Sequence, residues 1–211
     1  VAQAAMDSGV ARRPIIDMDA YEVELSSRLN PTAGSLHRIF EDLRASPKRV
    51  VFAEGEEEKS IRAAYAFLNG GFGKPVLIGR EERIKDELSL LGLPNSKDIE
   101  ITNSKLSANI QTYIEMLYER MQRRGYLERD CERLVKRDRN LLGALMVEAG
   151  DADVLVTGLT RNYHRALQQI MQVLEVAPDR HAFGLSLVMS RGQTLFVADT
   201  AVHEVLSAEQ I

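Results

Sequence analysis

The sequence predicts an α/β protein of three layers, in which helices cover both faces of a mostly parallel sheet. First, short β-rich segments alternate with helical segments over most of the chain, an order typical of right-handed crossovers between parallel strands. Second, several of the helical segments carry a single apolar stripe. Third, the last two β segments are separated only by a tight turn. An antiparallel hairpin is therefore expected at the start of a second lobe.

The predicted parallel strands are short runs of apolar and β-branched residues, which suit burial inside a sheet. They cover residues 50–53, 76–78, 99–102 and 154–157. The hairpin strands are expected at residues 185–189 and 194–197, with the turn at 190–193 between them.

The predicted helices lie between these strands and ahead of the first of them. Several end at a recognisable signal, such as the Gly70-Gly71 pair or Gly92. The first long helix stops at Asn30-Pro31, and residues 31–35 have the chemistry of a turn, which makes them the best candidate for a linker. The predicted helices cover residues 17–29, 36–44, 57–69, 81–91, 106–121, 128–136, 140–149 and 163–175.

Composition excludes several classes of function. The net charge is −4 and acidic and basic residues are interleaved, so no basic face is available for nucleic acid. The apolar runs are far shorter than the ~20 residues of a membrane-spanning helix, and no secretory signal is visible. Cys131 is the only cysteine. It cannot form an internal disulfide, which fits the reducing cytoplasm, and we interpret it as a surface or half-buried helix residue rather than a nucleophile.

Candidate binding residues follow the strands, because ligands of doubly wound sheets lie beyond the carboxyl ends of the strands. Residues 53–56 and 157–161 each place a glycine after a strand, which lets backbone amides approach an anion. After the second of these segments, two arginines at a helix start can grip a phosphate or a carboxylate. The alternative is a plain turn followed by solvated charges. The candidate residues are Thr157, Gly158, Arg161, Tyr163 and Arg165.

Other motifs provide weaker indications of a functional site. The acidic run at residues 54–58 is most simply the favourable first turn of a helix, with an acid–base role as the weaker alternative. The chain has neither a G-x-G-x-x-G motif nor a Walker loop, so it offers no nucleotide-cradling loop of those kinds. Its four histidines are scattered without the spacing of metal ligands. We therefore expect no metal site.

Three stretches together resemble a known family. Residues 49–57, residues 142–158 and residues 194–203 are similar to the opening strand, the central strand and the hairpin of phosphotransacetylases and of the related C-terminal domain of long bacterial malic enzymes. The resemblance covers residues 46–211 and implies a fold like those of phosphotransacetylase and isocitrate dehydrogenase. Residues 4–15 resemble the last helix and tail of the malic enzyme catalytic module.

The resemblance implies a division of the chain. Residues 1–30 would be the tail of the catalytic module, 31–46 a linker and helix, 47–180 the first phosphotransacetylase-like lobe, and 181–211 the start of a truncated second lobe. Ser207 and Gln210 form a capping-box pattern with no helix after it. We therefore expect the chain to be a fragment.

The resemblance also implies a function. Active phosphotransacetylases carry an arginine where Gln168 stands, and their Ser-Arg and Asp catalytic set would lie beyond Ile211. No catalytic residue is therefore expected in this chain. The implied role is an acetyl-CoA-binding regulatory and oligomerisation domain of an NADP-dependent malic enzyme, which converts malate to pyruvate. NADP and a divalent metal, Mg or Mn, would then bind only in the absent catalytic module.

Two alternatives remain open. The chain could belong to an active phosphate acetyltransferase, which moves acetyl between CoA and phosphate. It could also be an assembly platform that binds no ligand.

Overall fold

The computed structural model describes residues 1–11, 13, 15–18, 21, 22, 25, 28, 31–93, 96–104, 109–178, 180–190, 193–199 and 201–203. Of residues 31–35 and 96 it describes only the backbone. The chain divides into two compact units. The sheet unit is Leu43–Pro178, and the hairpin unit combines Val1–Asp42 with Asp179–Ile211.

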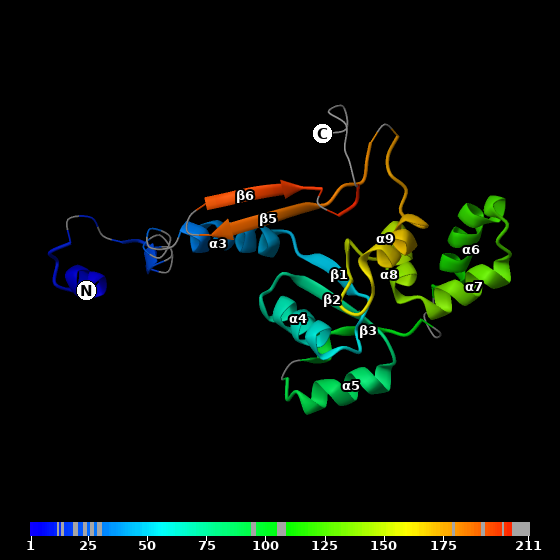
Figure 1. The fold of residues 1–211 in the computed structure, drawn as a ribbon. Helices are drawn as coiled ribbons and strands as arrows, with labels where there is room; N and C mark the ends of the chain where they lie inside the picture. The colour runs from blue at the N-terminus through cyan, green and yellow to red at the C-terminus, as the bar shows by residue number, and fades with distance from the viewer. Residues whose placement is uncertain are drawn as a thin grey trace. The chain divides into compact units, whose positions relative to one another are not determined.

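The sheet unit contains a four-stranded parallel sheet in the order β3-β2-β1-β4 (Figure 1). Val51 of β1 lies in the middle of the sheet, opposite Val76 of β2 on one side and Leu155 of β4 on the other. The predicted strands and their parallel pairing are thus confirmed. The strands are β1 Lys48–Phe52, β2 Gly73–Ile78, β3 Glu100–Thr102 and β4 Val154–Val156.

Helices cover both faces of this sheet, which confirms the three layers (Figure 1). Successive residues of a strand point to opposite faces. Val50 and Phe52 accordingly pack with α4 and α5, whereas Val51 packs with α6, α7 and α8. The helices are α4 Glu58–Asn69, α5 Glu81–Leu90, α6 Ile110–Met121, α7 Glu128–Arg137, α8 Arg139–Glu148 and α9 Tyr163–Met171, with short 3-10 turns at Ser96–Asp98 and Gln122–Arg124.

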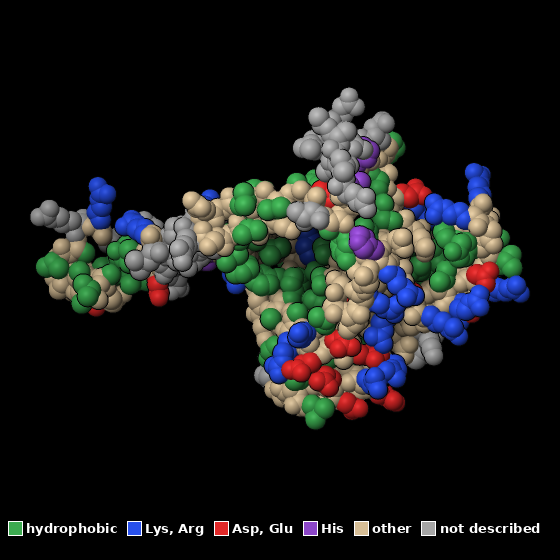
Figure 2. Space-filling view, in the orientation of Figure 1, with side chains coloured by type: hydrophobic (Ala, Val, Ile, Leu, Met, Phe, Trp, Pro, Cys, Tyr) green, Lys and Arg blue, Asp and Glu red, His purple; other side chains and the backbone are tan. Residues whose placement is uncertain are grey.

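The hairpin unit contains the predicted antiparallel pair, β5 Leu185–Ser190 and β6 Gln193–Ala198. The two residues between these strands lie outside the described residues. Hydrophobic side chains are visible along the hairpin in Figure 2, and those exposed include Leu185, Leu187, Val188, Leu195 and Phe196. The unit also contains the short helix α1 Ala2–Asp7.

The linker predicted at residues 31–35 is wrong, because helix α3 runs through it, over Pro31–Ala45. Proline is well tolerated as the first residue of a helix, where its fixed φ suits the helix and its missing N–H would have no partner. Residues 31–35, whose composition is typical of a turn, therefore form the start of a helix. The predicted helix at 17–29, Leu106 and the Ser207–Gln210 pattern fall largely or wholly outside the described residues. Helix α9 ends at Met171, four residues earlier than predicted.

Cys131 is fully buried in α7, deeper than the half-buried position expected. Burial raises the pKa of its thiol, and the charges of Asp130 and Glu128 raise it further. The thiol is therefore held in the protonated form that makes a poor nucleophile.

No helix in the described part is long and apolar enough to cross a membrane. The described residues also contain no group of three or more His, Cys, Asp or Glu side chains able to hold a metal ion.

Candidate functional site

The loops at the carboxyl ends of the strands surround the point where the strand order reverses. The chain moves outward from β1 through β2 to β3, then returns to place β4 on the other side of β1. In open parallel sheets, the crevice at such a reversal is the usual ligand site. Here it lies between the loop after β1 and the loop after β4.

Glu54, in the loop after β1, closes part of this crevice. Its side chain is buried, and its carboxylate accepts hydrogen bonds from the amide of Leu159 at 2.9 Å and from the amide and hydroxyl of Thr160 at 2.7 and 2.8 Å. Burial raises the pKa of this carboxyl, but the hydrogen bonds from Thr160 and Leu159 outweigh it, so the pKa is lowered overall. Glu54 is thus a charged internal acceptor that joins the two loops.

This corrects the interpretation of the acidic run at residues 54–58 as a helical first turn. Helix α4 begins at Glu58, so only Glu58 lies in its first turn. Glu54 and Glu56 precede the helix, and each carboxylate is engaged with another loop.

Four of the backbone amides near this turn already have partners inside the chain. Glu54 occupies those of Leu159 and Thr160. At the start of α9, Asn162 Oδ1 accepts from the amides of His164 and Arg165 at 3.0 and 3.4 Å. An anion at this turn would therefore depend mainly on side chains.

The structure places all five predicted site residues on one loop and the first turn of α9. Thr157 is half-buried, and its hydroxyl donates to Asn140 Oδ1 at 2.6 Å. Gly158 has φ 104°, a conformation that favours glycine. Arg161, Tyr163 and Arg165 are exposed. Among the described residues neither arginine forms an ion pair. Gln168 also lies on α9, with its side chain exposed.

A polar network around the buried Asn140, which sequence reasoning missed, supports this loop. Asn140, almost fully buried, accepts from Thr157 and donates from Nδ2 to Gln169 Oε1 at 3.0 Å. Asp138 caps α8 by accepting from the amides of Asn140 and Leu141, and it also accepts from the Gln169 amide group. An aspartate ahead of a helix is a recognisable N-cap signal. The contacts to Gln169 and Thr157 had no such signal.

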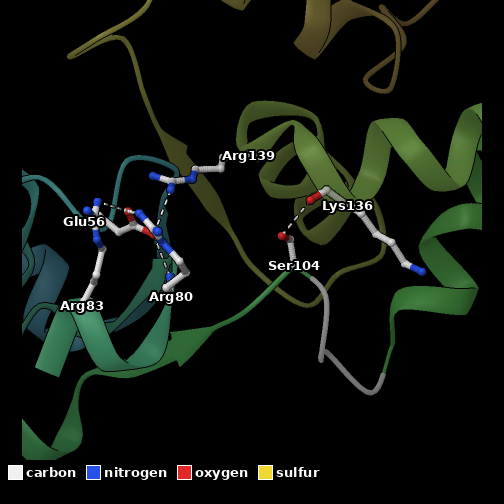
Figure 3. A network of polar contacts seen from close by, with 6 residues as sticks. All are labelled: Glu56, Arg80, Arg83, Ser104, Lys136 and Arg139. Atoms are coloured by element: carbon white, nitrogen blue, oxygen red, sulfur yellow. Dashed lines mark hydrogen bonds and ion pairs between the residues drawn. The ribbon is translucent and has the colours of Figure 1, made fainter.

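A second feature that sequence reasoning missed is the arginine cluster, which we define as Arg80, Arg83 and Arg139 around Glu56 (Figure 3). Arg80 Nε and Nη2 donate to the two oxygens of Glu56 at 3.0 and 2.8 Å. Arg139 Nη2 lies 2.9 Å from Oε1 and Arg83 Nη1 lies 3.5 Å from Oε2. The hydrogen bond with Arg80 is the largest cause that lowers the pKa of Glu56.

The comparisons with known proteins agree with this fold. A family model for phosphate acetyl/butaryl transferase matches residues 35–211. An NADP-dependent malic enzyme of Rhizobium meliloti is 46% identical over 212 residues, which is all of this chain and 28% of that enzyme. A phosphate acetyltransferase of Clostridium acetobutylicum is 30% identical over 143 residues, 68% of this chain and 42% of that enzyme.

Solved structures give the same result at the level of the fold. The EutD phosphotransacetylase from Staphylococcus aureus matches with a TM-score of 0.71 and 21% identity, covering 81% of this chain and 54% of that one. The chain spans little more than a quarter of the malic enzymes it matches, such as those of Rhizobium meliloti and Escherichia coli. These matches confirm the predicted resemblance to the phosphotransacetylase-like part of malic enzymes. The chain belongs to the phosphate acetyl/butaryl transferase family.

Proposed function

We propose that this chain is the regulatory region of a cytoplasmic NADP-dependent malic enzyme, where it binds acetyl-CoA and contributes to self-association. One observation carries the proposal. The whole chain aligns with a malic enzyme at 46% identity, whereas the acetyltransferase of Clostridium acetobutylicum aligns with 68% of it at 30% identity. The oxidative decarboxylation of malate to pyruvate, with NADP and Mg or Mn, would belong to the part of the enzyme outside this chain.

The proposed acetyl-CoA site is the turn formed by Thr157 and Gly158 with the first turn of α9. Its backbone amides at residues 159, 160, 164 and 165 are engaged by Glu54 and Asn162. The exposed guanidinium groups of Arg161 and Arg165 would therefore bind the phosphates of CoA. Tyr163, which lies between them in the sequence, is 46% exposed, and its ring would offer an aromatic face to the ligand.

Self-association has separate support in the hairpin unit. Leu187 of β5 and Phe196 of β6 lie opposite each other in the hairpin and are 42% and 64% exposed, and Leu185, on the same face, is 59% exposed. Neighbouring exposed apolar side chains are typical of surfaces that a partner covers. We propose that a second copy of the enzyme does so here.

Replacing both arginines of the proposed site should weaken inhibition of the full-length enzyme by acetyl-CoA. For Arg161→Ala with Arg165→Ala, the inhibitory concentration should rise about tenfold or more, because desolvated charge-assisted contacts contribute about 1.5–3 kcal/mol each. Inhibition of malate oxidation is measured relative to the uninhibited rate of each variant.

The matched control for this experiment is Arg62→Ala with Arg129→Ala, which removes two exposed positive charges elsewhere on the sheet unit. Equal inhibition curves for the two double variants would discard Arg161 and Arg165 as the effector site. If acetyl-CoA neither binds nor inhibits the full-length enzyme, the regulatory proposal is wrong. The remaining interpretation is then an assembly platform that binds no ligand.

Family membership and the acetyltransferase relative favour a second candidate, active transfer of acetyl between CoA and phosphate. We expect no such activity from this chain, because Gln168 supplies an amide where the resemblance calls for an arginine. The test follows release of CoA thiol from acetyl-CoA in phosphate buffer, with the Staphylococcus aureus phosphotransacetylase as positive control. Measurable turnover by the purified chain would establish the transferase instead.

A further inference from the structure

The arginine cluster has more positive charge than its internal partner can neutralise. Three guanidinium groups converge on the one carboxylate of Glu56, which leaves two positive charges in excess (Figure 3). A structural role for Glu56 requires one arginine, since Arg80 alone engages both of its oxygens. The approach of two more like charges is unfavourable unless an anion compensates them.

The geometry of the cluster suits an external anion. Glu56 is the innermost member, with its side chain 8% exposed, whereas those of Arg80, Arg83 and Arg139 are 59%, 65% and 34% exposed. Arg83 and Arg139 each contact Glu56 through a single nitrogen, although a guanidinium carries five N–H donors. The buried carboxylate thus orients the three groups while most of their donors stay open to solvent.

The position of the cluster points to the same conclusion. Arg80 immediately precedes α5 and Arg139 is the first residue of α8, so the positive ends of two helix dipoles lie close to it. Of the acidic groups in these helix starts, Asp138 is engaged in capping α8, and Glu81 is paired with Lys85 at 2.5 Å. Glu82 is the remaining carboxylate in the first turn of α5. The positive charge of the cluster still exceeds it.

We propose that Arg80, Arg83 and Arg139 form a phosphate-binding site, separate from the turn at residues 157–165, for inorganic phosphate or a phosphate monoester. A phosphate matches the excess positive charge, and its oxygens match the forked donors of arginine. The site does not depend on acetyl-CoA acting as a regulator. Free phosphate and the phosphate of a nucleotide share this chemistry.

Isothermal titration calorimetry of the 211-residue chain at low ionic strength tests the site with two probes, inorganic phosphate and 3′,5′-ADP. Each of Arg83→Ala and Arg139→Ala should weaken binding tenfold or more. Arg62→Ala is the control, since it also removes one exposed arginine that pairs with a glutamate, and it should change binding less than twofold. Arg139→Lys keeps the charge but loses the forked donors, so its affinity for the probes should lie between those of the original chain and of Arg139→Ala.

The two probes identify the source of the phosphate. Saturable binding of inorganic phosphate assigns the site to the free ion, whereas binding of 3′,5′-ADP alone, with the same dependence on Arg83, assigns it to a nucleotide. Should Arg139→Ala fail to fold, Arg83→Ala decides, because its contact with Glu56 at 3.5 Å is the longest in the cluster. Absence of saturable binding for both probes, or an equal loss in Arg62→Ala, would overturn the proposal.

Discussion

Replacing Glu54 with alanine is expected to destabilise the chain by about 2–4 kcal/mol. The carboxylate is buried and accepts three hydrogen bonds from Leu159 and Thr160, across the crevice between the loops after β1 and β4. Hydrogen bonds to a charged group are each worth about 1.5–3 kcal/mol, but Leu159 and Thr160 are exposed, so water can replace part of the loss. Urea denaturation at pH 7 measures the change in the free energy of unfolding.

Glu58→Ala is the matched control, because it removes an exposed glutamate that pairs with Arg62 within α4. Surface pairs of this kind contribute about 0.2–1 kcal/mol. If Glu54→Ala shifts the urea midpoint no more than Glu58→Ala does, Glu54 does not stabilise the loop after β4.

The same substitution should change the response to acid. The pKa of Glu54 is lowered in the folded chain, so its contribution is present above the unfolded pKa of about 4.3 and is lost as pH falls through the folded pKa. The free energy of unfolding of the original chain should therefore decline below about pH 4, and that of Glu54→Ala should decline less steeply.

Gly73→Ala is expected to cost at least about 3 kcal/mol, by preventing the first residues of β1 and β2 from pairing. Gly73 has φ 145°, and a Cβ there would lie 1.9 Å from the carbonyl oxygen of Lys48 and 2.6 Å from its amide nitrogen. These are backbone atoms of the residue that Gly73 pairs with, so no side chain can move to make room. Relief requires the two strands to separate, which breaks neighbouring hydrogen bonds of the sheet.

The control is Gly92→Ala, at a glycine with φ 62° and no atom within 4 Å of the added Cβ. Only the backbone conformation opposes this change, at about 1–2 kcal/mol. Urea and thermal denaturation of the two variants should therefore differ clearly. Equal destabilisation would mean that the β1–β2 pair tolerates the methyl group.

Much of the fold could be predicted because its signals are local. The strands around Val51 and Val76 are buried on both faces, so their sequences are continuous apolar runs. In the helices between them, apolar residues recur with the helical period, because only one face of each helix is covered. The same local reasoning failed at Pro31, since the residues that build turns also begin helices.

The candidate site was predicted only in part. A glycine after a strand predicted the loop that begins at Thr157. The carboxylate of Glu54, however, accepts a hydrogen bond from the amide of Leu159 in that loop although it lies 105 residues earlier in the chain. Arg80 and Arg139 likewise come from separate elements to meet Glu56. No spacing in the sequence links these residues.

The layers, the parallel strands, the hairpin and the family could all be predicted from the sequence alone. Each of these depends on the period of apolar residues or on motifs that are continuous in the chain. Which groups meet at the carboxyl edge of the sheet depends instead on how the strands are arranged in space. The order β3-β2-β1-β4 places β1 between β2 and β4, so the loop after β1 can supply Glu54 to one neighbour and Glu56 to the other. Hydrogen bonds between loops follow from strand order in space, and local sequence patterns do not encode that order.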